Sequence, residues 1–241
     1  MDTALVLAEQ LHVALLGVFV EDVNLVRLAS LPFAREVGRL SALERPLAQQ
    51  DVERLFRLQR ARMRALMADV AGPSKLAWSF EAVRGQLFAE VLSRRRGGDL
   101  VVMAPADASP RVGRPSIPAR RERTQPPRRG CIAAVLTDAT RFAATLSAAA
   151  RLAQGQDFGL CAWIAAAPPD VLRHEALGWI RARGLAARIS VISLANGRQL
   201  AADLRAVNAA AVVTGCPTNQ REAVQVEALR SAAPCPIVLV P

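Results

Sequence analysis

Residues 130–137 read Gly-Cys-Ile-Ala-Ala-Val-Leu-Thr, an uninterrupted apolar run that predicts a buried strand. Residues 139–154 follow with apolar side chains three and four positions apart, which predicts a helix that ends at Gly155. The same alternation of strand and helix continues to the end of the chain. The further strands are expected at 158–164, 187–194, 210–214 and 236–240, and the further helices at 168–184, 196–207 and 219–232.

This order predicts an α/β domain over residues 130–241. Parallel strands need crossover connections, and helices of ten or more residues supply them. Strands that are apolar along their whole length indicate a sheet covered on both faces. The sequence therefore predicts a doubly wound, five-stranded parallel sheet with strand 130–137 away from its edges.

The region before it repeats part of this pattern. We expect helices at 3–11, 24–31, 47–70 and 86–95, and strands at 13–20, 76–83 and 99–104. Residues 1–104 are therefore interpreted as a partial α/β domain. Residues 105–129 are rich in proline and arginine, a composition that builds no core, so they are expected to be a poorly ordered linker.

Composition fits a packed protein with a strong positive charge. Hydrophobic residues make up 52% of the 241 residues, and the net charge is +10, carried almost wholly by arginine because Lys75 is the only lysine. Such a charge attracts nucleic acid non-specifically, although a genome-wide preference for arginine is the simpler explanation. Residues 94–96 and the linker arginines could contact phosphate or could be solvated. Without interleaved aromatic residues, no specific nucleic-acid binding is expected.

The cysteines and histidines suggest no metal site and no disulfide framework. The four cysteines form no C-x-x-C pair, and His12 and His174 lie far apart and are interpreted as ordinary surface residues. Cys131 and Cys161 lie in apolar runs and are interpreted as small buried hydrophobes in a reducing cytoplasm. The N-terminus has no signal-peptide pattern, and the longest apolar run has ten residues, so a membrane span is not expected.

Three stretches resemble the universal stress protein family, particularly its tandem members. They are residues 17–38 (GVFVEDVNLVRLASLPFAREVG), 135–140 (VLTDAT) and 233–241 (APCPIVLVP). The resemblance implies a five-stranded parallel sheet in the order 3-2-1-4-5, paired as dimers or tandem halves. It also implies a role in the stress response and a cytoplasmic location.

The resemblance weakens at the ATP motif of the family, G-x2-G-x9-G-[ST] after the fourth strand. Gly215 fits the first glycine, but Thr218 replaces the second, and Ala228 and Leu229 replace the closing pair. In the first half Ala104-Pro105 replaces even the first glycine, and proline has no N–H to donate. Glycines let backbone N–H groups approach phosphates. We therefore expect no bound ATP, with a dissociation constant weaker than ~100 μM, or about 5.5 kcal/mol.

Five residues remain candidates for a vestigial nucleotide crevice at the carboxyl ends of the strands. Asp138 could hold a ligand, or it could cap the following helix. Thr214, Gly215 and Thr218 could line the same crevice or form a turn. The full candidate set is Asp138, Thr140, Thr214, Gly215 and Thr218.

These observations favour a regulatory or interaction protein of the universal-stress type over an enzyme. No nucleophile and base occur at catalytic spacing, so we expect no catalytic residues. A protein partner or self-association would then carry the function. One alternative is a degenerate adenine-nucleotide-binding protein that uses the second half, and another is an anion-binding module that uses the arginine-rich linker.

One expected element is missing from the first half. In the family a central strand precedes the helix that begins here at Thr3, and Met1-Asp2 is too short to supply it, since strands usually have about 5 residues. Either the true chain starts upstream of Met1, or a strand from elsewhere fills the gap. The first explanation is favoured because helix, strand and motif then follow in the family order.

Overall fold

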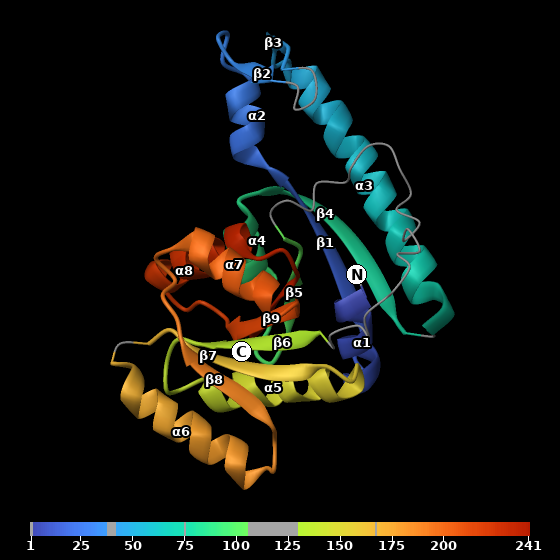
Figure 1. The fold of residues 1–241 in the computed structure, drawn as a ribbon. Helices are drawn as coiled ribbons and strands as arrows, with labels where there is room; N and C mark the ends of the chain where they lie inside the picture. The colour runs from blue at the N-terminus through green and yellow to red at the C-terminus, as the bar shows by residue number, and fades with distance from the viewer. Residues whose placement is uncertain (1, 38–41, 75, 106–129, 167) are drawn as a thin grey trace, which may run out of the picture. The chain divides into compact units, whose positions relative to one another are not determined.

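The chain is divided into two compact units. The computed structural model describes residues 2–37, 42–74, 76–105, 130–166 and 168–241 (Figure 1). Unit 1 comprises residues 1–95 and unit 2 residues 96–241. The predicted linker, apart from Pro105, lies outside the described residues. No helix in the described part of the chain is both long enough and apolar enough to cross a membrane.

Unit 2 contains the predicted alternation of strands and helices. Each predicted element of residues 130–241 is present, with bounds that differ by a few residues at most. The elements are β5 (Val101–Met103), β6 (Cys131–Leu136), α5 (Phe142–Gly155), β7 (Gly159–Ile164), α6 (Pro169–Ala182), β8 (Ala187–Val191), α7 (Gly197–Ala206), β9 (Ala209–Gly215), α8 (Gln220–Ala232) and β10 (Ile237–Val240).

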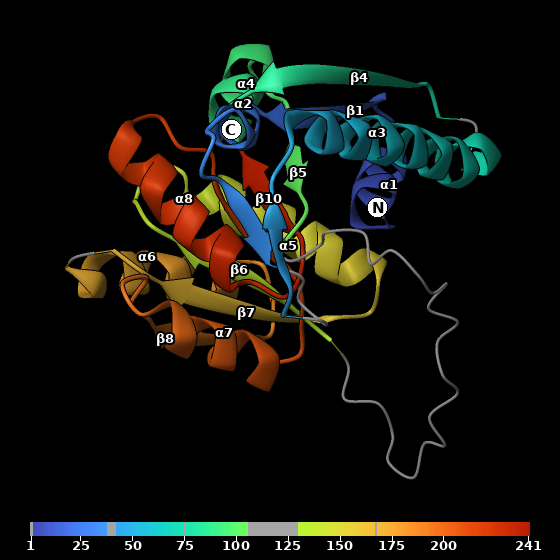
Figure 2. The ribbon, with the colours of Figure 1, turned by 90° about the horizontal axis from the view of Figure 1, so that it is seen from above.

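The sheet of unit 2 has the predicted topology. Five strands of this six-stranded sheet run β8-β7-β6-β9-β10, all parallel, which is the order 3-2-1-4-5, and β5 is added at the edge. Strand β6 is central, and each of its six residues is buried. Helices α5 and α6 cover one face, and α7 and α8 cover the other (Figures 1 and 2). Right-handed crossovers produce this arrangement, because the chain places β7 and β8 on one side of β6 and then β9 and β10 on the other.

The core of unit 2 is built from aliphatic side chains, as the scarcity of aromatic residues required. On α5, Ala149 and Ala153 are buried toward the sheet, and Leu146 and Leu152 are fully enclosed. Small residues on this face let the helix approach the strands closely, so that larger side chains fill the remaining space. Because this core holds the strands in place, it also fixes the positions of the loops at the strand ends.

Strand β5 corrects the predicted domain boundary. We expected residues 99–104 to belong to the first half, but Val101–Met103 pairs antiparallel with β10, with Val102 opposite Val238. Without β5, the outer edge of β10 would present unpaired N–H and C=O groups. The short run Val-Val-Met suits any sheet edge, so its sequence does not reveal which unit it joins.

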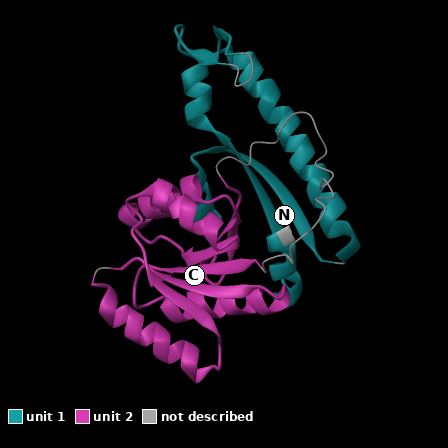
Figure 3. Cartoon of the chain, in the orientation of Figure 1, with its two compact units in different colours: residues 1–95 teal, residues 96–241 magenta. Residues whose placement is uncertain are grey.

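Unit 1 has a smaller sheet than a complete domain of this type. Strands β1 and β4 pair in parallel, Leu15 opposite Trp78, and among the described residues they form a two-stranded sheet (Figure 3). A hairpin of β2 and β3 was not predicted. The tandem arrangement of two such domains stays a prediction. The elements are α1 (Asp2–Leu11), β1 (Leu15–Asp22), α2 (Val23–Ala29), β2 (Arg35–Val37), β3 (Glu44–Pro46), α3 (Gln49–Ala71), the 3-10 turn η1 (Gly72–Ser74), β4 (Trp78–Gly85) and α4 (Leu87–Arg94).

The predicted long helix α3 supplies the core of unit 1. Val52 and Phe56 are buried with Ala29 of α2, and the ring of Phe56 meets that of Phe19 edge to face at 6.4 Å. Further along the helix, Met67 covers Gly17 of β1, where an added Cβ would overlap the Met67 sulfur. Gly17 therefore leaves room for the Met67 side chain against β1.

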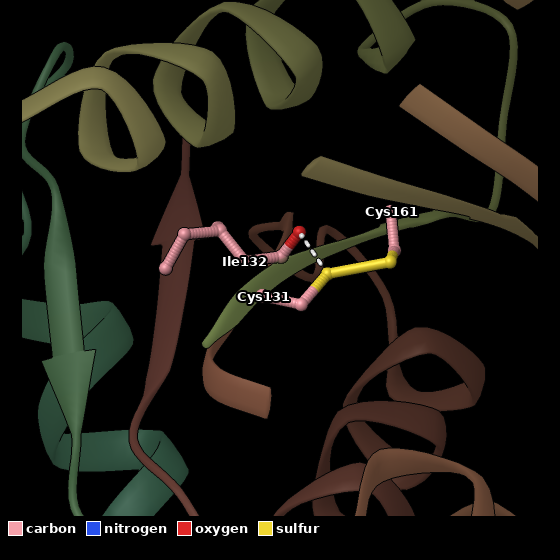
Figure 4. Close-up of a disulfide and its surroundings, with 3 residues drawn as sticks. All are labelled: Cys131, Ile132 and Cys161. Carbon is pink, nitrogen blue, oxygen red and sulfur yellow. Dashed lines mark hydrogen bonds between the residues drawn. A yellow bond between two sulfur atoms is a disulfide. The ribbon is translucent and has the colours of Figure 1, made fainter. Parts of the chain in front are cut away.

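The structure also corrects the interpretation of two cysteines. Cys131 and Cys161 are buried, as expected, but their Sγ atoms are joined in a disulfide between β6 and β7 (Figure 4). Cys161 lies opposite Ala133 in the β6–β7 register, which places the two Cα atoms 6.5 Å apart, within bonding range. Because 30 residues separate the two cysteines, the pairing depends on strand order.

Candidate functional site

The carboxyl ends of β6 and β9 bring the predicted site residues to one edge of the sheet of unit 2. The two strands are neighbours, with Val135 opposite Thr214. Asp138 follows β6, and Gly215 is the last residue of β9. This edge is also the place where the strand order reverses direction, the usual ligand-binding position of open α/β sheets.

Asp138 organises the turn that leads into α5. Its Oδ1 accepts hydrogen bonds from the backbone N–H groups of Thr140 and Arg141, both at 2.9 Å, and from the Thr140 hydroxyl at 2.6 Å. These donors belong to the turn before α5, whose N-cap is Arg141 without a side-chain capping bond. Asp138 therefore holds this turn and does not cap the helix itself, and Thr140 belongs to the same turn.

Arg141 lies at the centre of the site, and sequence analysis did not identify it. Its Nη2 lies 2.7 Å from Asp138 Oδ2 and 3.0 Å from Glu222 Oε2. Its Nε donates to Asp138 Oδ2 at 2.9 Å, and its Nη1 donates to the carbonyl oxygen of Cys216. The guanidinium is 17% exposed and joins the loops that follow β6 and β9.

Glu222 completes the network from the start of α8. Its Oε2 accepts from the backbone N–H of Thr218 at 2.9 Å, and its Oε1 accepts from Asn219 Nδ2 at 2.8 Å. Asn219 Oδ1 in turn accepts from the Glu222 N–H at 3.0 Å. This reciprocal pattern resembles a capping box, in which residues three apart satisfy the first donors of a helix.

The remaining two predicted residues have structural roles. The Thr214 hydroxyl is buried and donates to the Val135 carbonyl at 3.0 Å, which ties β9 to β6 inside the sheet. At Gly215 an added Cβ would lie 3.3 Å from Arg141 Nε and 3.4 Å from Cδ and Cζ. The glycine therefore makes room for the arginine side chain.

The charged side chains of Asp138, Arg141 and Glu222 shift one another's pKa values. Burial on its own would raise the pKa of Asp138, but hydrogen bonds from Thr140 and Arg141 and the charge of Arg141 outweigh it and lower that pKa to about 2. Burial also opposes ionisation of Glu222, yet its bonds to Thr218 and Arg141 lower its pKa overall. Both carboxylates therefore stay ionised at neutral pH, and together they outnumber the single cation.

The positions of the metal-ligand side chains and of the two histidines bear on the chemistry of this site. Within the described residues, no three His, Cys, Asp or Glu side chains are grouped in a way that could hold a metal ion. His174 Nδ1 lies 3.0 Å from the Asp170 carbonyl on the exposed side of α6, and His12 ends α1 in the left-handed region. Neither histidine belongs to the Asp138–Arg141–Glu222 network.

Two sequence signals could have revealed part of this network. Asp138 and Arg141 are three residues apart at a helix start, and Asn219 and Glu222 have the spacing of a capping box. No local signal could show that Arg141 reaches Glu222, because 81 residues separate them.

Comparison with known proteins gives only distant likenesses. No family model matches the chain, and no curated protein matches it. Among solved structures, a functionally unknown protein from Pseudomonas aeruginosa PAO1 is 10% identical, with a TM-score of 0.44 over 94% of this chain and 92% of that one. A candidate universal stress protein from Pseudomonas aeruginosa UCBPP-PA14 is 9% identical, with a TM-score of 0.43 over the same shares. Neither likeness is close enough to transfer a function.

Proposed function

We propose that this chain is a universal-stress-like regulatory or interaction protein that acts through its surface, without catalysis and without tight ATP binding. The observation that carries the proposal is the position of Arg141, which lies against Gly215 between Asp138 and Glu222. In the family pattern, the phosphates of ATP would approach the backbone beside this glycine.

The donors that could hold a phosphate are already engaged. The N–H of Thr218 donates to Glu222, and the N–H groups of Thr140 and Arg141 donate to Asp138. The carboxylates of Asp138 and Glu222 thus accept the hydrogen bonds that the oxygens of a bound phosphate would need. A polyphosphate would have to displace them from Arg141, and hydrogen bonds to charged groups contribute about 1.5–3 kcal/mol each.

The same network argues against catalysis. Two hydroxyls of the network have a carboxylate beside them: Thr140 donates to Asp138, and Thr218 donates to Glu222, whose pKa is also lowered. A general base works best when its pKa lies near the working pH. Because the pKa of Asp138 is lowered to about 2, its carboxylate is a weak base for activating the hydroxyl.

An interaction surface is supported by apolar side chains of unit 1. The side chains of Leu28 and Leu31 at α2, of Phe33 in the loop that follows, and of Val37 in β2 are exposed, and Phe33 is 75% exposed. Grouped exposed apolar residues on a soluble domain mark protein contacts more often than isolated ones do. We assign this group, residues 28–37, as the surface for a protein partner or for self-association.

Calorimetric titration with ATP tests the central claim. We expect a dissociation constant weaker than ~100 μM for the wild-type chain. Micromolar affinity that is lost in Gly215→Val would overturn the proposal in favour of the alternative, an adenine-nucleotide-binding protein that uses unit 2. Gly178→Val, at an exposed glycine of α6 where an added Cβ meets no atom within 4 Å, is the matched control.

Sedimentation velocity tests the proposed surface. The variant Phe33→Asp places a charge in the apolar group, and Val171→Asp makes the same change at a 61% exposed valine of α6. We expect Phe33→Asp to reduce self-association, or capture of a partner from the native cell, whereas Val171→Asp leaves it unchanged. Equal behaviour of the two variants would contradict the assignment.

A further inference from the structure

The end of the sheet opposite the candidate site holds a cavity with the disulfide in its wall. The cavity has a volume of ≈ 340 Å³ and lies at the amino ends of β6, β7 and β8. Cys131 and Cys161 both line it, together with Asp157 and Arg188. The volume falls within the usual range of small-molecule pockets, about 300–1,000 Å³.

The register of the sheet places a cation beside one of the two sulfurs. Arg188 of β8 lies directly opposite Cys161 of β7. Directly paired residues of neighbouring strands project to the same face, and both residues line the cavity. Arg188 is exposed and makes no ion pair within the described residues. Its charge is available to a ligand, and a neighbouring arginine favours the thiolate form of a cysteine.

The other sulfur lies in a different environment. Cys131 Sγ lies beside the carbonyl oxygen of Ile132 (Figure 4), and the two atoms are 3.5 Å apart. An acceptor at this position stabilises a protonated thiol, because only the neutral form can donate to it. The two cysteines are therefore unequal in the reduced state, and Cys161 has the more nucleophilic surroundings.

We propose that Cys131 and Cys161 form a reversible redox centre that exchanges with a small thiol that carries a carboxylate and binds in this cavity. Arg188 binds the carboxylate of that thiol. Glutathione and free cysteine belong to this chemical class. The cavity is at the opposite end of the sheet from Arg141 and Gly215, so the redox centre is independent of the proposed function.

The exchange balances as two thiol–disulfide steps. The thiolate of the first small thiol attacks Cys161 Sγ, the bond to Cys131 Sγ breaks, and Cys131 leaves as a thiolate that takes up a proton. A second small thiol then attacks the small-molecule sulfur of the mixed disulfide and releases Cys161 as a thiol. Two small thiols are oxidised to one disulfide, and two electrons and two protons pass to the protein.

The first experiment equilibrates the full chain with mixtures of reduced and oxidised glutathione, followed by acid quenching, alkylation and peptide mass spectrometry. We expect the Cys131–Cys161 pair to change reversibly from disulfide to dithiol across the series while circular dichroism stays unchanged. Cys235 serves as an internal control, because burial raises its pKa to about 11 and it stays unmodified. A pair that does not respond to the mixtures, or a chain that unfolds on reduction, would overturn the proposal.

The second experiment tests the two assigned roles. In Arg188→Gln, the ratio of the reduction rates by glutathione and by neutral 2-mercaptoethanol should fall about two- to fivefold, the size of one exposed ion pair, whereas Arg198→Gln should keep the wild-type ratio. Oxidised glutathione should add faster to Cys161 in the variant Cys131→Ser than to Cys131 in Cys161→Ser. An unchanged ratio, or equal rates of addition, would contradict the assignment of Arg188 or of Cys161.

Discussion

The guanidinium of Arg141 packs against Gly215, where an added Cβ would come within 3.3 Å of Nε. A glycine at the end of a parallel strand can open the backbone to phosphate. In this chain Gly215 instead admits a side chain that joins two loops. Gly215 therefore serves internal packing.

Replacing Arg141 tests how much the network contributes to stability. In Arg141→Gln, the carboxylates of Asp138 and Glu222 would lose their common cation and face each other. We expect the free energy of unfolding to fall by about 1–3 kcal/mol, measured by urea denaturation at neutral pH. The control Arg173→Gln should change it by less than about 0.5 kcal/mol.

A double-mutant cycle tests whether the two residues act together. In Arg141→Gln, the variant Asp138→Asn should cost less than it does in the wild-type chain, because its charged partner is already absent. Residues in one ion-pair network show coupling of about 0.5–3 kcal/mol. Strictly additive losses would show that the 2.7 Å contact between Nη2 and Oδ2 contributes no stability.

Acid should remove the contribution of Asp138. Its pKa is lowered from 3.8 to about 2 in the folded chain, so the unfolded state binds the proton more tightly. The stabilisation is fully present above pH 4 and is lost as the pH falls from about 4 to about 2. After allowance for partial exposure, we expect a loss of about 1 kcal/mol. Asp138→Asn should lower the stability at neutral pH and flatten this part of the pH profile.

Local sequence predicted the sheet of unit 2 well because its central strands are apolar along their length and alternate with helical patterns. Strand 130–137 was placed correctly at the centre, and Asn196 caps α7 by accepting from the Gln199 N–H. The site was predicted only in part. Asp138 was named as a candidate and holds the turn before α5, but Arg141 was missed because its role depends on Glu222, which the fold brings close.

Non-local pairings account for the other differences. Strand β5 joins β10 across more than a hundred residues, and the disulfide joins Cys131 to Cys161 of the neighbouring strand. Short apolar runs and single cysteines have the same local pattern whether or not they are paired. Strand order, which follows from the packing of the whole sheet, determines the partner.

The positive charge predicts weak and unselective binding to nucleic acid. Helix α3 exposes Arg54, Arg57, Arg62 and Arg64, which make no ion pairs within the described residues. Binding through such side chains releases counterions and falls steeply with salt. Fluorescence anisotropy with two unrelated duplexes should give equal affinities that are lost by ~0.3 M salt. Sequence-selective binding that survives this salt concentration would contradict the prediction.

Two buried methionines provide a matched test of the boundary between the units. Met103 of β5 and Met67 of α3 are 5% and 3% exposed, and truncation of either to alanine should cost about 2–4 kcal/mol. Because β5 pairs with β10, Met103→Ala should accelerate hydrogen exchange of the amides at 237–240 and leave those of β1 and β4 unchanged. Met67 covers Gly17, so Met67→Ala should have the opposite pattern. If Met103→Ala instead accelerated exchange in β1 and β4, residues 96–104 would belong to unit 1, as the sequence had first indicated.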